Sequence, residues 1–344
     1  MDFNKLGDNG LLTMLALHRM AQMARENNGD DDDGIRIREI PDDDQNTTTP
    51  RGPSNSASVT SSIEQLFHLD EKSSAYLQER KYEEAYGLVK KQYKLGSKFN
   101  FAPVLVKYYV SLIHTDRLDK AAKIRDELTS LIQELLESSP EELEKYGHSL
   151  RQKSKFIEAI LFYQISHRFC ETEMNPADAV SALQGCALGT KLAVTELLEK
   201  HKVSKQTVRK HVIPEMHKFI DCLGRFKSVE KKLICIVQGL CLHHVEHCEF
   251  LVGDVNAREA SIKRAITSMK DVLGSEAEKH HLYGGHLNNL GHTYLVKDRP
   301  GDAASYFSQA IVAKKRAEDY DTQAEKLEDI KKSELALQLA RRQL

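Results

Sequence analysis

The chain has 344 residues, of which 40% are hydrophobic and 29% charged, and its formal net charge is −2 at pH 7. This balance provides no basic field for phosphate groups, so we expect no binding to nucleic acid or to a membrane surface. Trp is absent and aromatic residues make up only 7% of the chain, which argues against a platform for stacking bases.

The cysteines and the hydropathy pattern favour a cytoplasmic protein. None of the six cysteines forms a C-x-x-C pair, and all lie in apolar helical surroundings, as expected of small buried side chains in a reducing compartment. The short apolar run Leu11–Leu17 has no small-residue cleavage site after it. No later stretch has the roughly eighteen apolar residues of a membrane span.

At the N-terminus, residues 8–26 favour a short helix. Residues 27–62 contain runs of aspartate together with prolines, threonines and serines. Low hydrophobicity and like charge leave little to offset the entropy of ordering, so this segment is predicted to be a disordered tail. We therefore expect two parts, an N-terminal segment over 1–62 and a helical repeat domain over 63–344.

From residue 63 onward the sequence predicts an all-α fold. Apolar residues recur at three- and four-residue spacing, and helices of roughly 12 to 25 residues alternate with short polar turns. Asn175-Pro176 marks one boundary, and Pro300-Gly301 lies in another. No segment alternates with period two over a convincing length, so a sheet is not expected.

The clearest internal repeat covers residues 284–317, which read as two helices joined by a turn at 298–301. Small residues at the crossing point let the two helices approach closely, and aromatic residues fill the space beside them. The repeat-packing residues are Leu287, Leu290, Gly291 and Tyr294 on the first helix, and Ala303, Phe307 and Ala310 on the second.

This arrangement resembles the tetratricopeptide repeat (TPR), in which a large apolar residue, Leu-Gly and Tyr are followed by Ala, Phe and Ala within about 34 residues. Lys315 stands where the family has its final Pro. The run Leu287–Gly291 is most similar to the kinesin-light-chain-like subgroup. The resemblance implies a right-handed α-solenoid of antiparallel helix pairs.

Three weaker copies of the same template precede this one. The first is centred on Ala85, the second on Ala121, and the third includes Gly147, Ala159 and Tyr163. In the second copy the small position holds Tyr109 and the aromatic position holds Arg125. Residues 176–270 are helical but out of register, and the sequence leaves open whether they are true repeats or an insertion.

The last helix, over about residues 319–344, is expected to be a capping helix. It places Leu327, Ile330, Leu337 and Leu344 on one stripe, with charged residues on its other faces. An apolar stripe on an otherwise charged helix is what the terminal cap of a solenoid requires.

The resemblance implies a protein-binding function. In this family the first helices of successive repeats line a concave groove that holds an extended peptide or a partner helix. The groove positions of the best copy are Asn288, Asn289 and His292, and an Asn amide can both donate to and accept from a peptide backbone. We therefore expect a scaffold or adaptor that binds another protein.

One specific activity of the family is not expected. Repeats that grip a C-terminal carboxylate use Lys, Asn and Arg at fixed first-helix positions. The acidic residues among the corresponding side chains would repel a carboxylate; those side chains are Asp70, Ser74, Lys107, Glu141 and Lys145.

Neither an enzyme nor a metal protein is predicted. The chain contains none of the common nucleophile, zinc-protease, phosphate-loop or dinucleotide motifs. His243 and His247, at i and i+4 on one helix, could bind one metal ion. His280 and His281, further along the chain, are the other candidate histidine ligands. No carboxylate or Cys pair is obviously placed to complete such a site, so we expect no metal and no cofactor.

Two alternative functions remain open at this level. The chain is alternatively a structural subunit of a larger assembly, which exposed apolar patches and self-association would favour, or a regulatory repeat module of a signalling or innate-immune system. The helix at 8–26 is also a candidate autoinhibitory segment that docks in the groove. The sequence does not fix the partner or the oligomeric state.

Overall fold

In a computed structural model of the protein, the described residues are 82, 83, 85–87, 90, 101–135, 138–171, 175–200 and 202–344. They are almost entirely helical and contain no strand, as the all-α prediction requires, and twelve α-helices pack in neighbouring pairs. No helix in this part of the chain is long and apolar enough to cross a membrane. The expected N-terminal segment over 1–62 lies outside the described residues, and so does the start of the expected repeat domain, residues 63–81.

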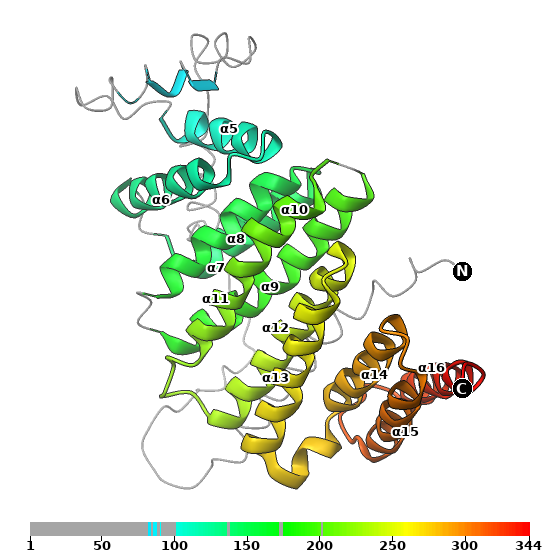
Figure 1. Ribbon diagram of the computed structural model, residues 1–344. Coiled ribbons are helices and arrows are strands. Elements are labelled where there is room, and N and C mark those ends of the chain that lie inside the picture. Colours follow the sequence, from blue (N-terminus) through cyan, green and yellow to red (C-terminus); the bar gives the residue numbers. More distant parts are fainter. Residues whose placement is uncertain are drawn as a thin grey trace, which may run out of the picture. The chain divides into compact units, whose positions relative to one another are not determined.

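Consecutive helices mostly pack against one another along the chain (Figure 1). The helices are α5 (Phe101–His114), α6 (Leu118–Leu135), α7 (Pro140–Gln152), α8 (Phe156–Cys170), α9 (Pro176–Glu199), α10 (Lys205–Thr207), α11 (Ile213–Leu223), α12 (Lys231–Val252), α13 (Val255–Leu273), α14 (His281–Val296), α15 (Pro300–Arg316) and α16 (Gln323–Arg341).

Four helix pairs close with the same turn: α5–α6, α7–α8, α12–α13 and α14–α15. Each turn contains one residue with left-handed backbone geometry, at Asp116 (φ 57°), Ser154 (φ 59°), Gly253 (φ 78°) and Asp298 (φ 55°). Because only two or three residues separate the helices of a pair, the two helices run antiparallel.

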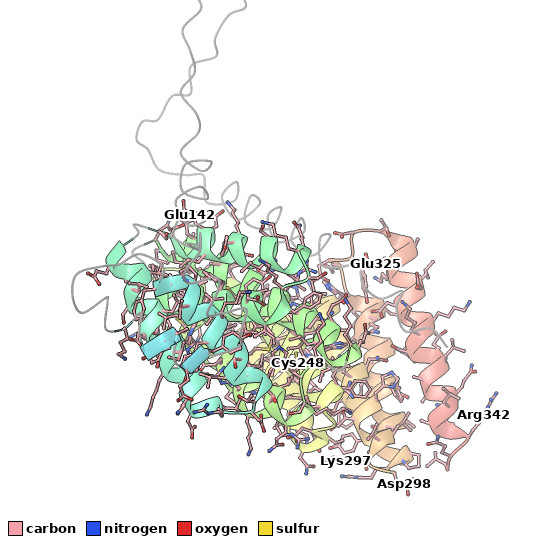
Figure 2. All side chains as sticks on the ribbon, turned by 90° about the horizontal axis from the view of Figure 1, so that it is seen from above. Glu142, Cys248, Lys297, Asp298, Glu325 and Arg342 are labelled. Atoms are coloured by element: carbon pink, nitrogen blue, oxygen red, sulfur yellow. The ribbon has the colours of Figure 1, made fainter. Side chains whose placement is uncertain are left out.

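The hydrogen bonding of these turns is also shared. The residue after the left-handed position donates its backbone N–H to the carbonyl five residues earlier, which is the Schellman pattern. The four bonds are Arg117 to Leu112 (2.9 Å), Lys155 to Leu150 (2.9 Å), Asp254 to Glu249 (2.8 Å) and Arg299 to Tyr294 (2.9 Å). Figure 2 labels Lys297 and Asp298 in the last of these turns.

Two of the pairs also share a contact between a glycine and an aromatic ring. Gly147 of α7 faces Tyr163 of α8, and Gly291 of α14 faces Phe307 of α15. A Cβ atom added to Gly147 or to Gly291 would lie 2.6 Å or 2.7 Å from the opposing ring. Glycine and ring are sixteen residues apart in both pairs, and both rings are fully buried. The paired helices therefore approach more closely than any larger residue would allow.

The other repeat-packing positions are buried as well. They are Leu287, Leu290, Tyr294, Ala303, Ala310, Ala159, Ala121 and Ala85. In the copy around Ala121, Tyr109 and Arg125 are also buried. An Arg125 guanidinium nitrogen lies 3.0 Å from a carboxylate oxygen of Glu215, so an ion pair between α6 and α11 stands where α7–α8 and α14–α15 have a glycine–ring contact.

The out-of-register stretch divides into two parts. Residues 231–273 form α12 and α13 with the shared turn, whereas α9, α10 and α11 do not follow that pattern. Between α10 and α11 the chain forms a π-helical turn over Val208–Val212. Pro214 follows at the start of α11, and its missing N–H and fixed φ disfavour a regular helix before it.

The terminal helix packs through a different seam from the one expected. Ile330 of α16 is buried, but Leu327 and Leu344 are 57% and 78% exposed. Leu337 is half-buried against the core, and the rest of the buried seam is made by small residues, Ser333, Ala336 and Ala340, which allow α16 to lie close to α15. Figure 2 labels Glu325 and Arg342 near the two ends of α16.

The glycine–ring contact predicts opposite effects for two glycines of α14. Gly291→Ala places a methyl group against the Phe307 ring, so we expect it to lower the free energy of unfolding by about 1–3 kcal/mol through overpacking. Gly285→Ala meets nothing within 4 Å, and a helical alanine should raise that free energy by about 0.5–1 kcal/mol. Urea unfolding followed by circular dichroism measures both. Equal effects of the two substitutions would contradict the close approach.

Candidate functional site

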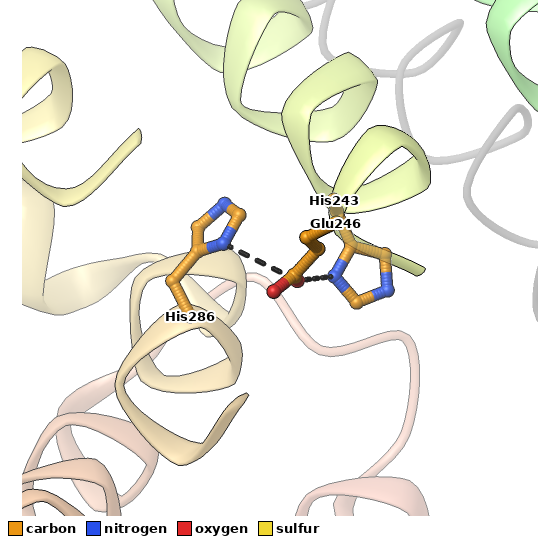
Figure 3. Close-up of side chains that lie close together, drawn as sticks. All are labelled: His243, Glu246 and His286. Carbon is orange, nitrogen blue, oxygen red and sulfur yellow. Dashed lines mark ion pairs between the residues drawn. The ribbon is translucent and has the colours of Figure 1, made fainter. Parts of the chain in front are cut away.

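A cluster of polar side chains lies where α12 meets α14. His243 and Glu246 are three residues apart on α12, and His286 and Asn289 are three residues apart on α14. Residues at this spacing share one face of a helix, so each helix presents two polar groups to the other. Figure 3 shows His243 and Glu246 of α12 and His286 of α14 pointing toward one another.

The Glu246 carboxylate is the centre of this cluster. Its Oε1 lies 2.9 Å from His243 Nδ1 and 3.7 Å from His286 Nδ1. The same oxygen accepts a hydrogen bond of 2.6 Å from Asn289 Nδ2. One ligand atom from each of His243, Glu246 and His286 falls within 4.8 Å of the other two.

The cluster is buried on one side and open on the other. Glu246 and His286 are fully buried, whereas the His243 side chain is 41% exposed. Burial by itself raises the pKa of the Glu246 carboxyl, but its interactions with the nearby His243 and His286 rings outweigh that effect and hold the pKa below its usual range. Glu246 is therefore a carboxylate at neutral pH.

Several buried atoms of the cluster lack a hydrogen-bond partner. They are Glu246 Oε2 and both ring nitrogens of His286, Nδ1 and Nε2. The Nε2 side of the His286 ring faces Gly239 of α12, where an added Cβ would lie 3.8 Å away. Buried polar atoms without a partner are uncommon in folded proteins, and here three of them lie in one cluster.

The neighbouring histidines of α12 do not belong to the cluster. Burial lowers the pKa of His247 to about 4 and that of His244 well below its usual value, so both are neutral at pH 7. The sequence singled out His243 with His247 at i, i+4. The structure instead brings His243 together with Glu246, at i+3, and with His286 of another helix.

The three predicted groove residues lie together on α14, but two of them have partners within the chain. Asn288 Oδ1 accepts a hydrogen bond of 2.9 Å from Ser333 Oγ of α16, and Asn289 donates to Glu246. His292 is exposed, and its ring packs edge-on against Phe307 with centroids 4.9 Å apart. Contact with a partner at these positions stays a prediction.

An enclosed cavity elsewhere in the fold offers no room for a substrate. It is lined by apolar residues together with Tyr109 and His211, whose Oη and Nε2 lie 2.9 Å apart. Its volume is about 10 Å³, which holds at most about one water molecule. Small-molecule sites are typically several hundred Å³.

Comparison of the sequence with protein-family models found no match, and comparison with curated proteins also found none. The resemblance to tetratricopeptide repeats therefore stays a prediction from the sequence.

Two neighbouring asparagines provide a test of the cluster. Asn289→Ala removes the donor to a buried carboxylate, so we expect a loss of about 1.5–3 kcal/mol in the free energy of unfolding. Asn288→Ala removes an acceptor of Ser333 Oγ, which keeps a contact with Lys314 Nζ at 2.9 Å. Its expected loss is about 0.5–1.5 kcal/mol. Urea unfolding ranks the two, and a larger loss for Asn288→Ala would show that Asn289 does not support Glu246.

Proposed function

We propose that this chain is a protein-binding scaffold, a tetratricopeptide-type α-solenoid that holds a partner peptide or helix. The observation that carries the proposal is the recurrence of one Schellman turn in four helix pairs. Repetition of a helix pair is the hallmark of solenoid folds, whose stacked units create extended binding surfaces.

One further feature supports this function. The glycine–ring contact recurs with the same sixteen-residue spacing in α7–α8 and α14–α15, as a shared repeat template would require. All six cysteines are free and buried, and this supports a reducing, cytoplasmic setting.

The proposed partner surface is the face of α14 that carries Asn288 and His292. In tetratricopeptide repeats the first helix of each pair faces the groove, and α14 is the first helix of its pair. His292 is exposed there, and Asn288 is half-buried. We leave Asn289 out of this surface because its amide donates to Glu246.

The experiment is affinity capture from cell extract with the full chain, followed by a binding titration with the protein that is retained. We expect Asn288→Ala with His292→Ala to weaken that binding about tenfold, the loss of roughly 1.4 kcal/mol of contacts. Ser305→Ala with Gln309→Ala changes two exposed residues of α15, the second helix of the pair, and should leave the affinity unchanged.

Equal affinities for the two double variants would place any binding away from α14. Failure of the wild-type chain to bind any retained protein in the titration would contradict the scaffold function itself. Circular dichroism at matched temperature confirms that both variants stay folded.

A second function, a structural subunit of a larger assembly, is favoured by the exposed leucines of α16. Among the described residues, large hydrophobic side chains are exposed mainly in the C-terminal part of the chain; they are Phe250, Val296, Val312, Leu327, Leu335, Leu339 and Leu344. Leu335 and Leu339 are one helical turn apart on α16, and both are about half exposed.

Self-association tests this second function. If these leucines lie at an interface between copies, light scattering after size exclusion will report an oligomer, and Leu335→Glu will shift it to monomer because a buried charge is costly there. Gln338→Glu adds the same charge at an exposed position of the same helix and should leave the oligomer intact. A monomeric wild-type chain would exclude assembly through identical copies.

A further inference from the structure

We infer that His243, Glu246 and His286 form a binding site for one divalent metal ion of the zinc class, which bridges α12 and α14. The inference is independent of the proposed function, because a metal ion between two helices serves a scaffold as well as any other fold.

The donor set fits such an ion. Two imidazoles and one carboxylate are a common protein ligand set for zinc, usually completed by water. Bond lengths of about 2.0–2.2 Å around a tetrahedral ion place ligand atoms about 3–4 Å apart. The Glu246 Oε1 atom lies 2.9 Å and 3.7 Å from the two histidine Nδ1 atoms, close to this spacing, and the ligand nitrogens of the two histidines lie within 4.8 Å of each other.

The unpaired atoms point to a ligand. His286 is fully buried, and neither of its ring nitrogens has a hydrogen-bond partner. Glu246 Oε2 is buried and unpaired as well. An ion among the three residues would use the lone pair of His286 Nδ1 and the negative charge of Glu246.

The candidate metal site is open to solvent on one side, and a neighbouring residue holds its carboxylate in place. The His243 side chain is 41% exposed, so the site opens to solvent on that side and a water molecule can occupy a fourth coordination position. Asn289 donates to Glu246 Oε1 and so fixes the orientation of the carboxylate, as outer residues commonly do around zinc. We therefore assign Asn289 a positioning role.

The test measures metal binding by the full-length chain. After treatment with a chelator and dialysis, the chain is titrated with ZnCl₂, and bound zinc is counted by elemental analysis. We expect about one ion per chain and a rise in Tm on binding, because an ion that binds only the folded state stabilises it. Titration with CoCl₂ should give the visible absorption of a low-coordinate Co²⁺ ion with nitrogen ligands.

Variants assign the ion to these residues. His243→Ala removes the half-exposed ligand and should weaken zinc binding by more than about tenfold, and Asn289→Ala should weaken it by about tenfold. The matched control is His217→Ala, because His217 Nε2 lies 3.3 Å from Glu249 in another partly exposed His–Glu pair. That variant should bind zinc as the wild-type chain does.

Two results would overturn the inference. One is the absence of stoichiometric zinc binding by the wild-type chain. The other is zinc binding that His243→Ala and Glu246→Gln leave unchanged while both variants keep the wild-type circular dichroism spectrum.

Discussion

The close approach of paired helices, made possible by glycine beneath an aromatic ring, is the constraint on which the rest of the structure depends. Tyr163 of α8 shows this most clearly, because its ring packs against Gly147 of α7 and also against Gly189 of α9. One buried ring thus fixes the distances among three helices. Since the shared turn sets the direction of the second helix and the glycine sets its distance, turn and glycine together define the geometry of the α7–α8 and α14–α15 pairs.

Buried charges then determine which helices meet. Lys314 of α15 is almost fully buried, and its Nζ donates to Asp329 Oδ1 (2.8 Å) and Ser333 Oγ of α16. Its stem lies against Gly284 of α14, where an added Cβ would be 2.6 Å from Lys314 Cγ. A buried charge contributes little net stability, but a wrong pairing would leave it without a partner. We infer that Lys314 determines where α16 packs on α15 more than it contributes to the stability of that packing.

The sequence predicted what depends on short-range spacing and failed where distant residues decide. The copy at 284–317 was visible because its glycine, alanines and aromatic residues follow one template, and the all-α class followed from the same periodicity. The buried face of α16 was not visible in the sequence. Hydropathy favours leucines such as Leu327, whereas the buried residues beside Lys314 are small. The sequence paired His243 with His247 and did not single out Glu246, and only the packing of α12 on α14 adds His286 to the cluster.

Asn289 shows that a polar side chain on the first helix of a pair can be used within the fold itself. α12 and α14 are each the first helix of a pair, so their polar faces lie next to each other before any partner is present. A side chain one turn from the packing face can reach either a bound peptide or the neighbouring first helix. Asn289 reaches Glu246, while His292, three residues later, stays exposed. The polar face of α14 is thus divided: one part holds a buried carboxylate in place, and the other is exposed to solvent.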